Sequence, residues 1–258
     1  MTQARVRVGI AGGVGRVALA RPEKKNALDR QAAIELVEAL MEFEGDDDVR
    51  VVLLTADGDD FCAGADLGAL AALLDAPLEA HTKDATDLGR VFLTIRGMTR
   101  PVVAAVQGRA LGGGCGLATA CDVVLARDDA KFGYPEIRIG FMPAMVMTML
   151  RRSVGEKHAF DLVTSGRVLG AADAERVGLV SRVLATTGFT DEVERYVLSL
   201  AASPTASMGL TKRLFYRLDM LSFRDGIAEG VQANVEARQT EDFRTGILNF
   251  TSTKDRRT

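Results

Sequence analysis

Three short segments of the chain carry residue types that could perform chemistry: residues 60–66 (DFCAGAD), 106–122 (VQGRALGGGCGLATACD) and 131–150 (KFGYPEIRIGFMPAMVMTML). The first two are rich in glycine and alanine, so a ligand can approach their main chain closely. Each precedes a predicted helix, whose first N–H groups have no acceptor within the helix. Both are therefore candidates for binding an oxyanion through backbone donors. An ordinary strand-to-helix turn and close helix–strand packing are the alternative interpretations.

The glycine run at residues 112–114 follows neither of the common nucleotide-binding patterns. A dinucleotide fingerprint reads G-x-G-x-x-G with an acid about 20 residues further on, and a P-loop ends in G-K-[ST]. An oxyanion site is the better interpretation of this segment. Asp122, which stands just before a predicted strand, is interpreted as a structural acid.

The third segment contributes a carboxyl group, Glu136, in a predicted loop after Pro135. The aromatic and aliphatic side chains around it in the sequence should exclude water from this carboxyl. Desolvation disfavours the charged form, so the pKa of Glu136 should rise towards a value useful for general acid or base catalysis. A glutamate in a surface loop is the alternative.

The elements that must position these segments can be read from hydrophobic periodicity. Strands are predicted at residues 6–10, 16–21, 49–55, 102–106 and 123–126. Helices are predicted at residues 29–43, from about 66 and from about 84, and then at 156–164, 171–177, 191–202, 207–218 and 225–240. The strand-strand-helix order recurs at roughly 50-residue spacing, which predicts an α/β core. We place a boundary at residue 190, between a core (1–190) and a helical C-terminal part (191–258).

Composition excludes several classes of function. The chain has 258 residues, a net charge of −3, two histidines and three cysteines. A nucleic-acid partner, a histidine-rich metal site and a disulfide framework are therefore not expected. No apolar run approaches the ~18 residues of a membrane helix, and no signal peptide is apparent. We expect a cytoplasmic protein without a membrane partner.

Together with residues 21–28 (RPEKKNAL) and 170–183 (GAADAERVGLVSRV), these segments resemble the crotonase, or enoyl-CoA hydratase/isomerase, family over about residues 6–250. The resemblance implies an α/β fold in which ββα units form a spiral, with a helical C-terminal part that mediates trimerisation and covers the active site. It also implies an acyl-CoA or enoyl-CoA substrate and a homotrimer or homohexamer (a dimer of trimers). No separate cofactor is expected, because CoA is part of the substrate.

The resemblance also implies roles for single residues. The backbone N–H groups of Ala65 and Gly113 would form an oxyanion hole for the thioester carbonyl, with Glu136 as acid and base. Carbonyl groups around Ala63 would hold the CoA adenine. Candidate contacts to the CoA phosphates are Lys24, Lys25 and Lys212.

The acyl pocket is expected to be aliphatic and to suit an uncharged acyl chain. Its predicted residues are Leu67, Leu70, Leu73, Leu74, Phe92, Met142 and Met145. The polar stretch at residues 77–87 corresponds to a variable region of the family that borders the acyl site. His81, within this stretch, is interpreted as a surface residue.

One position departs from the family pattern. Gly116 stands where the hydratases typically carry the first of two glutamates, and only the second, Glu136, is retained. One carboxyl suffices to move a proton between Cα and Cγ, whereas addition of water normally uses a second group. The sequence therefore favours double-bond isomerisation slightly over hydration, although some family hydratases, including ones resembling methylglutaconyl-CoA hydratases, also carry glycine there.

Gly116 would also leave room in the substrate pocket for a bulkier acyl group or a substrate carboxylate. Thioester hydrolysis or decarboxylation on the same scaffold is therefore a further alternative. A CoA-binding subunit without catalytic activity is the last one.

Overall fold

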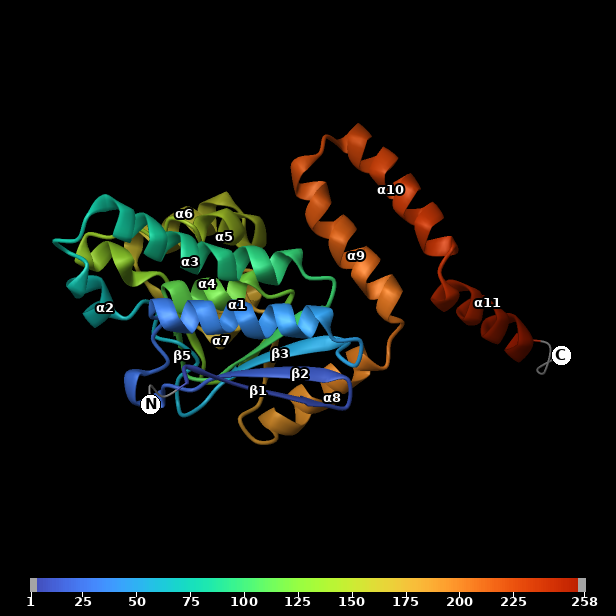
Figure 1. The fold of residues 1–258 in the computed structure, drawn as a ribbon, viewed down its shortest axis with the longest axis horizontal. Helices are drawn as coiled ribbons and strands as arrows, with labels where there is room; N and C mark the ends of the chain where they lie inside the picture. Colours follow the sequence, from blue (N-terminus) through green and yellow to red (C-terminus); the bar gives the residue numbers. More distant parts are fainter. Residues whose placement is uncertain (1–3, 255–258) are drawn as a thin grey trace.

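The computed structural model describes residues 4–254, which form an α/β core from which helices project (Figure 1). The central sheet has six strands in the order β1-β2-β3-β4-β6-β9. They are β1 (Val6–Ala11), β2 (Val14–Leu19), β3 (Val51–Ala56), β4 (Val102–Val106), β6 (Val123–Arg127) and β9 (Arg182–Leu184). β1 pairs with β2 antiparallel, and every other pair is parallel. The five predicted strands are confirmed to within a few residues.

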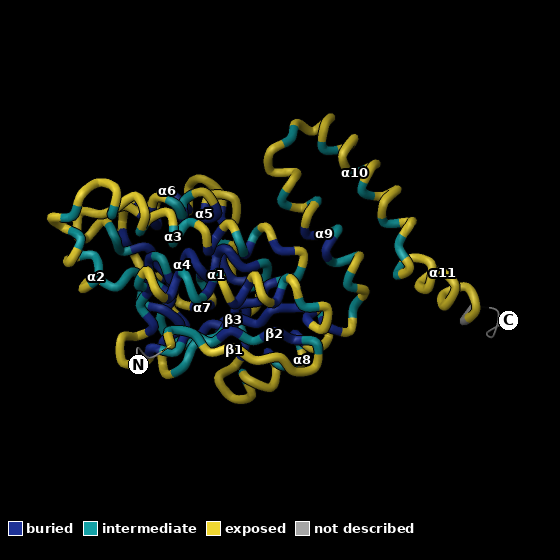
Figure 2. The backbone as a smooth tube through the Cα atoms, viewed as in Figure 1, coloured by how far each residue is buried: buried dark blue, intermediate teal, exposed yellow. Residues whose placement is uncertain are grey.

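The central strands are apolar throughout because both faces of the sheet are covered. Val52 and Leu54 point into the main core, which also includes side chains of α1 (Arg30–Gly45) and α3 (Leu78–Gly97). Val51 and Leu53 point to the other face, into a smaller core that includes side chains of α8 (Phe189–Ala201). Figure 2 shows the buried segments gathered between these layers.

A second sheet of three short strands stands beside the first and carries the glycine-rich segments. It has the order β5-β7-β8, formed by β5 (Arg109–Leu111), β7 (Lys131–Gly133) and β8 (Val168–Gly170). β5 is parallel to β7, and β7 is antiparallel to β8. Each strand has three residues, which is too short for periodicity to reveal, so the sequence did not predict them. The two sheets and their helices form the expected α/β spiral of ββα units.

The remaining core elements are short helices that connect the strands. They are the 3-10 helices η1 (Pro22–Lys24) and η2 (Pro135–Ile139) and the α-helices α2 (Leu67–Ala72), α4 (Gly113–Ala120), α5 (Met147–Val154), α6 (Glu156–Ser165) and α7 (Ala171–Arg176). The helix predicted from about residue 84 begins earlier, so that residues 78–87 of the polar stretch form the first half of α3. His81 is exposed there, as expected. No helix within residues 4–254 combines the length and hydropathy needed to cross a bilayer.

The helical C-terminal part begins later than predicted. α8 belongs to the core, because Val193, Val197 and Ala201 are buried against the sheet. The boundary at residue 190 is therefore wrong, since an amphipathic helix shows periodicity but not the layer on which it packs. The projecting helices are α9 (Thr205–Arg217), α10 (Phe223–Arg238) and α11 (Glu241–Lys254). They lead away from the core, and α10 and α11 are almost entirely exposed (Figures 1 and 2).

Candidate functional site

A cavity of about 320 Å³ lies between α2, the first turn of α4 and η2. It brings together residues from all three chemistry-bearing segments of the sequence. Of the predicted site residues, those that line it are Ala63, Ala65, Leu67, Leu70, Gly113, Glu136, Met142 and Met145. Its walls are therefore largely aliphatic, as expected for a pocket that binds an acyl chain.

Residues 62–66 run along the wall of the cavity, bend at Gly64 (φ 101°) and are held from two sides. On one side the Leu28 N–H donates to the Gly64 carbonyl (2.7 Å). On the other the Cys62 N–H donates to the first carbonyl of β5 (2.9 Å). The Gly64 carbonyl and the Asp66 N–H, on either side of Ala65, are both hydrogen-bonded to Leu28. The Ala65 N–H has no acceptor among residues 4–254. A backbone donor is thus fixed in place and left free.

The first turn of α4 supplies a second free donor. Gly112 caps the helix at φ 53°, ψ −125°, a conformation that needs glycine. Gly113 follows as the first helical residue, and its N–H also has no acceptor in the described part of the chain. A Cβ atom added to Gly113 would meet nothing closer than 3.9 Å, and one of its two nearest atoms would be the Ala65 nitrogen. The two donors therefore flank one open space, in which an oxyanion could be bound.

Glu136 lies beside this space on η2. A Cβ atom on Gly112 would lie only 3.0 Å from Glu136 Oε1, so glycine also makes room for the carboxyl. Oε2 is buried and has no hydrogen-bond partner among the described residues. Burial raises the pKa of Glu136 above its ordinary value of 4.5. The predicted desolvation of this carboxyl is confirmed, and the group is suited to exchange a proton with a ligand in the cavity.

The loop that carries Glu136 is anchored by a hydrogen bond that the sequence did not reveal. Tyr134 is completely buried, and its hydroxyl lies 2.9 Å from Thr119 Oγ1 on α4. The Thr119 hydroxyl in turn donates to the Cys115 carbonyl (2.7 Å). This chain of contacts fixes the start of η2 relative to the helix whose first turn supplies the Gly113 donor.

Two buried polar residues fix the beginning of the 60–66 segment and were also missed. Asn26 donates to the carbonyls of Asp57 and Asp60, both at 2.8 Å. The Asp60 carboxylate accepts from the Arg109 side chain at 2.6 and 2.8 Å, and these hydrogen bonds lower the pKa of Asp60. Asn26 belongs to the RPEKKNAL motif, which was a sequence signal but gave no indication of this role.

The prediction that Gly116 opens space in the pocket is wrong. Gly116 is buried in α4, and a Cβ atom on it would lie 2.1 Å from Val146 Cγ1 and 3.5 Å from Phe92 Cζ. Val146 and Phe92 therefore fill the position that a longer side chain at residue 116 would need. Three other predicted pocket residues also lie outside the cavity lining, namely Leu73, Leu74 and Phe92.

We expect Gly116→Ala to destabilise the protein by about 1–3 kcal/mol, the usual cost of overpacking a core. A decrease in stability would be informative, because replacing glycine by alanine in a helix interior normally stabilises the helix by about 1 kcal/mol. Urea unfolding followed by circular dichroism measures the change. Gly230→Ala, on α10 with no atom within 4 Å of its new Cβ, is the matched control and should not destabilise. Stabilisation by both substitutions would contradict the close contact with Val146.

The predicted phosphate contact of Lys212 is wrong. Its side chain is buried, and Nζ donates to the carbonyls of Ile95 (2.8 Å) and Arg100 (2.9 Å) and pairs with Asp122 Oδ2 (2.7 Å). All three donors of the ammonium group are used within the chain. Asp122 also accepts from the Tyr216 hydroxyl (2.6 Å), which confirms it as a structural acid that joins α9 to the core.

Replacing Lys212 by methionine should lower the free energy of unfolding by about 3 kcal/mol, because it leaves the Asp122 carboxylate and two carbonyls without their partner. Equilibrium urea unfolding gives this value. Lys157→Met on α6 is the control, since Lys157 is exposed and its replacement should change stability little. If Lys212→Met lowers the free energy of unfolding as little as Lys157→Met does, the buried ion pair does not hold α9 in place.

Lys24 and Lys25 are both exposed and do not line the cavity. The Lys25 carbonyl accepts from the Ala63 N–H (3.0 Å), which places this loop beside Ala63. The Ala63 carbonyl accepts no backbone hydrogen bond from residues 4–254. It is therefore available to a ligand, and the roles of these three residues in binding CoA stay predictions.

The cysteines are not suited to nucleophilic chemistry. Cys62, Cys115 and Cys121 are buried, and burial raises the pKa of each thiol to about 12. Since the thiolate is the reactive form, these side chains stay protonated and inert at neutral pH.

Two adjoining sheets, a helix that begins in a glycine loop and a carboxyl beside free main-chain donors are the features of a crotonase-fold protein. The chain matches the enoyl-CoA hydratase/isomerase family over residues 9–257 and belongs to that family. It is therefore an enzyme of a family that acts on acyl-CoA substrates.

Individual relatives cover almost the whole chain. A Thermus thermophilus protein, classed by its name with the enoyl-CoA hydratases, is 38% identical, with 93% of this chain and 94% of the relative aligned. The 2,3-dehydroadipyl-CoA hydratase of Escherichia coli is 35% identical over 90% of this chain and 89% of its own. The crystal structure of an enoyl-CoA hydratase from Mycobacterium smegmatis superposes with a TM-score of 0.92, at 31% identity and 97% coverage of both chains.

Proposed function

We propose that this enzyme moves the double bond of an enoyl-CoA, with Glu136 as its single acid and base. The observation that carries the proposal is that, among the residues the structure describes, Glu136 is the only one with a carboxyl group that lines the cavity. Gly116 takes the position of the first of the two glutamates typical of the family's hydratases, and Val146 fills the space beside it. Chemistry that needs one proton-transfer group therefore suits this site best.

The proposed reaction has two proton transfers. The thioester carbonyl accepts hydrogen bonds from the N–H groups of Ala65 and Gly113, and the Glu136 carboxylate removes a proton from Cα of a 3-enoyl chain. The electron pair moves into the conjugated system, and its charge is held at the oxygen between the two donors. The protonated Glu136 then returns the proton to Cγ, so the double bond moves next to the carbonyl and no atom is gained or lost.

Hydration is the second candidate, and the names of the relatives favour it. The relatives from Thermus thermophilus and Escherichia coli are both named for hydratase activity. In this reaction Glu136 would activate a water molecule that adds to Cβ, while the same two donors hold the enolate oxygen. A water molecule would then have to be oriented by Glu136 and the substrate alone, because residue 116 offers no side chain.

The two candidates are separated by offering the enzyme 2-enoyl- and 3-enoyl-CoA substrates and analysing the products by mass spectrometry. Isomerisation leaves the mass unchanged, whereas hydration adds the mass of one water. We expect 3-enoyl-CoA to be converted to 2-enoyl-CoA faster than either compound gains water. Faster addition of water to 2-enoyl-CoA would establish hydration instead.

The pH dependence of the reaction should report on Glu136. Because burial raises the pKa of this carboxyl above 4.5, kcat/KM should fall as the pH drops through that raised pKa, where the base becomes protonated. The fall in kcat/KM on the acid side of the profile is therefore expected at a higher pH than it would be for an exposed glutamate. A profile of kcat/KM against pH measures it, and a limb at or below 4.5 would contradict the desolvated carboxyl as the base.

A further inference from the structure

A second cavity, of about 400 Å³, lies behind the catalytic one, between α3, α5 and the end of α9. Met145 lines both cavities. A Cβ atom on Gly89 of α3 would lie 3.3 Å from the Met145 sulfur, so the thioether lies against α3. Methionine is unbranched and has three rotatable bonds, which allows this partition to move without a change in the backbone.

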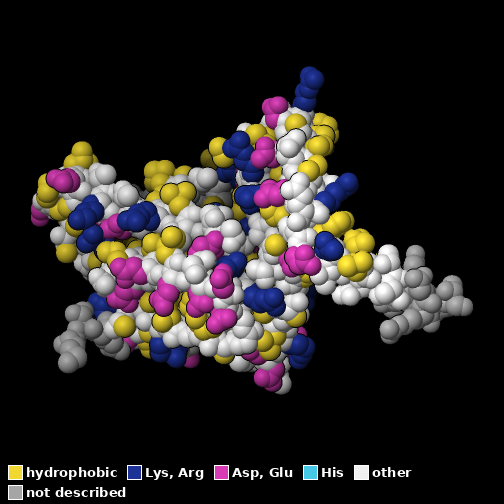
Figure 3. Space-filling view, turned by 45° about the vertical axis from the view of Figure 1, so that its right-hand side comes forward, with side chains coloured by type: hydrophobic (Ala, Val, Ile, Leu, Met, Phe, Trp, Pro, Cys, Tyr) yellow, Lys and Arg dark blue, Asp and Glu magenta, His cyan; other side chains and the backbone are white. Residues whose placement is uncertain are grey.

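The second cavity has apolar walls. Phe92 and Met149 form its buried side. Leu93 and Met220 form its outer side and are 74% and 75% exposed. Large apolar side chains that line a hollow yet stay in water mark a surface that a ligand covers. Figure 3 shows hydrophobic side chains distributed along the helices that project from the core on this side.

The charged side chains of the second cavity have partners within the chain, although Nε of Arg96 is buried with no partner among the described residues. The Arg152 side chain pairs with Asp219 (3.0 Å), and Arg96 donates to the Thr119 carbonyl (2.7 Å). The Arg96 guanidinium also stacks over the Tyr216 ring at 4.3 Å. The cavity therefore favours a hydrocarbon chain over a charged group.

We propose that the second cavity receives the distal part of a long acyl chain and that Met145 is the specificity-determining residue that admits it. The proposal rests on the proposed function, since the thioester must be held at Ala65 and Gly113. From there the acyl chain runs along the aliphatic wall of the catalytic cavity to Met145. Because Met145 lines both cavities, an acyl chain that displaces its side chain would pass from one to the other, which favours the acyl chain over another polypeptide as the occupant.

The test measures binding rather than turnover, so its failure is distinct from a failure of the proposed reaction. Saturated acyl-CoAs from butyryl- to dodecanoyl-CoA are titrated into the full-length protein by calorimetry. Each methylene that enters an apolar cavity should tighten binding by up to about fourfold. We expect the affinity to keep rising for chains longer than the catalytic cavity holds.

Thr148→Phe fills the second cavity from α5, where Thr148 is exposed and does not line the catalytic cavity. It should reduce the affinity ratio between dodecanoyl- and butyryl-CoA at least tenfold. Thr164→Phe, at an exposed threonine of α6 outside both cavities, is the matched control and should keep the wild-type ratio. Met220→Ser is a second variant with little risk to folding, and should lower the ratio by a smaller factor.

Three outcomes would overturn the proposal. The first is a wild-type affinity that stops rising at short chain lengths. The second is a ratio that Thr148→Phe and Met220→Ser both leave unchanged. The third is a change in oligomeric state on Thr148→Phe, seen by sedimentation, with an unchanged ratio, which would assign this cavity to a partner chain.

Discussion

Replacing Glu136 by glutamine should lower kcat/KM for an enoyl-CoA by ~10²–10⁴, the usual contribution of a positioned acid or base. The amide keeps the size of the side chain but neither accepts nor returns a proton at neutral pH. Because Oε2 of Glu136 has no protein partner among the described residues, the substitution breaks no internal hydrogen bond of that atom. The loss should therefore appear in turnover rather than in folding.

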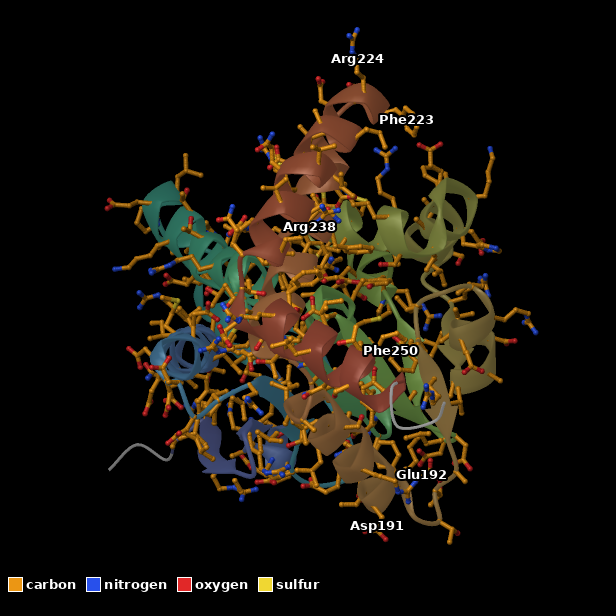
Figure 4. All side chains as sticks on the ribbon, turned by 90° about the vertical axis from the view of Figure 1, so that its right-hand side faces the viewer. Asp191, Glu192, Phe223, Arg224, Arg238 and Phe250 are labelled. Carbon is orange, nitrogen blue, oxygen red and sulfur yellow. The ribbon has the colours of Figure 1, made fainter. Side chains whose placement is uncertain are left out.

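The control for this variant is Glu192→Gln. Glu192 is exposed on α8, and Figure 4 shows it at the opposite end of the view from Phe223. Steady-state rates with 3-enoyl- and 2-enoyl-CoA, with melting temperatures and acyl-CoA affinities beside them, separate lost chemistry from lost binding. Equal turnover by the wild type and Glu136→Gln in both reactions would remove Glu136 from the mechanism.

Gly113→Pro should lower kcat/KM by ~10²–10³, the cost of removing one oxyanion donor. Proline has no N–H, yet it is well tolerated as the first residue of a helix, where the N–H has no intrahelical acceptor. Gly113 holds this position in α4, and the ψ of −125° at Gly112 lies outside the helical region that a following proline disfavours. The substitution thus deletes a single donor with little change to the helix.

The matched control is Gly113→Ala, which adds a methyl group to the same open space but keeps the N–H. Its loss of activity measures crowding by a methyl group on Cα, and the further loss in Gly113→Pro measures the exchange of the N–H donor for the proline Cδ. Circular dichroism and thermal melting should show both variants folded like the wild type. If alanine and proline reduce kcat/KM equally, the Gly113 N–H is not an oxyanion donor.

Much of the sheet could be predicted because its strands are long apolar runs. Residues 51–54 and 102–106 are buried on both faces, so the apolar, largely β-branched composition of these runs identifies them. β5 and β7 could not be found in this way, since three residues carry no measurable period. The position of α8 was missed for another reason: periodicity gives a helix its apolar face but not the layer that covers it.

The candidate site shows the same division. Glycine-rich turns and a carboxyl in apolar sequence have a local signature, which marked the three segments. The family resemblance then implied Ala65, Gly113 and Glu136 within them, and the structure brings these residues to one cavity. The contact between Gly116 and Val146 could not be predicted, because it joins residues 30 positions apart in sequence through tertiary packing. Lys212 was wrongly predicted to contact the CoA phosphates, because the sequence does not distinguish a lysine buried among carbonyl groups from a lysine on the surface.

The free donors of the cavity belong to the main chain, and this limits how the enzyme could escape inhibition. On the proposed mechanism, a compound that places a negatively charged oxygen between Ala65 and Gly113 would be held by two N–H groups that nearly every amino acid would supply. Side-chain substitutions at these two positions would therefore keep the contacts, since only proline lacks the N–H, and proline should also lower kcat/KM sharply. Resistant variants should instead change the acyl-chain walls, at residues such as Leu70 or Met142.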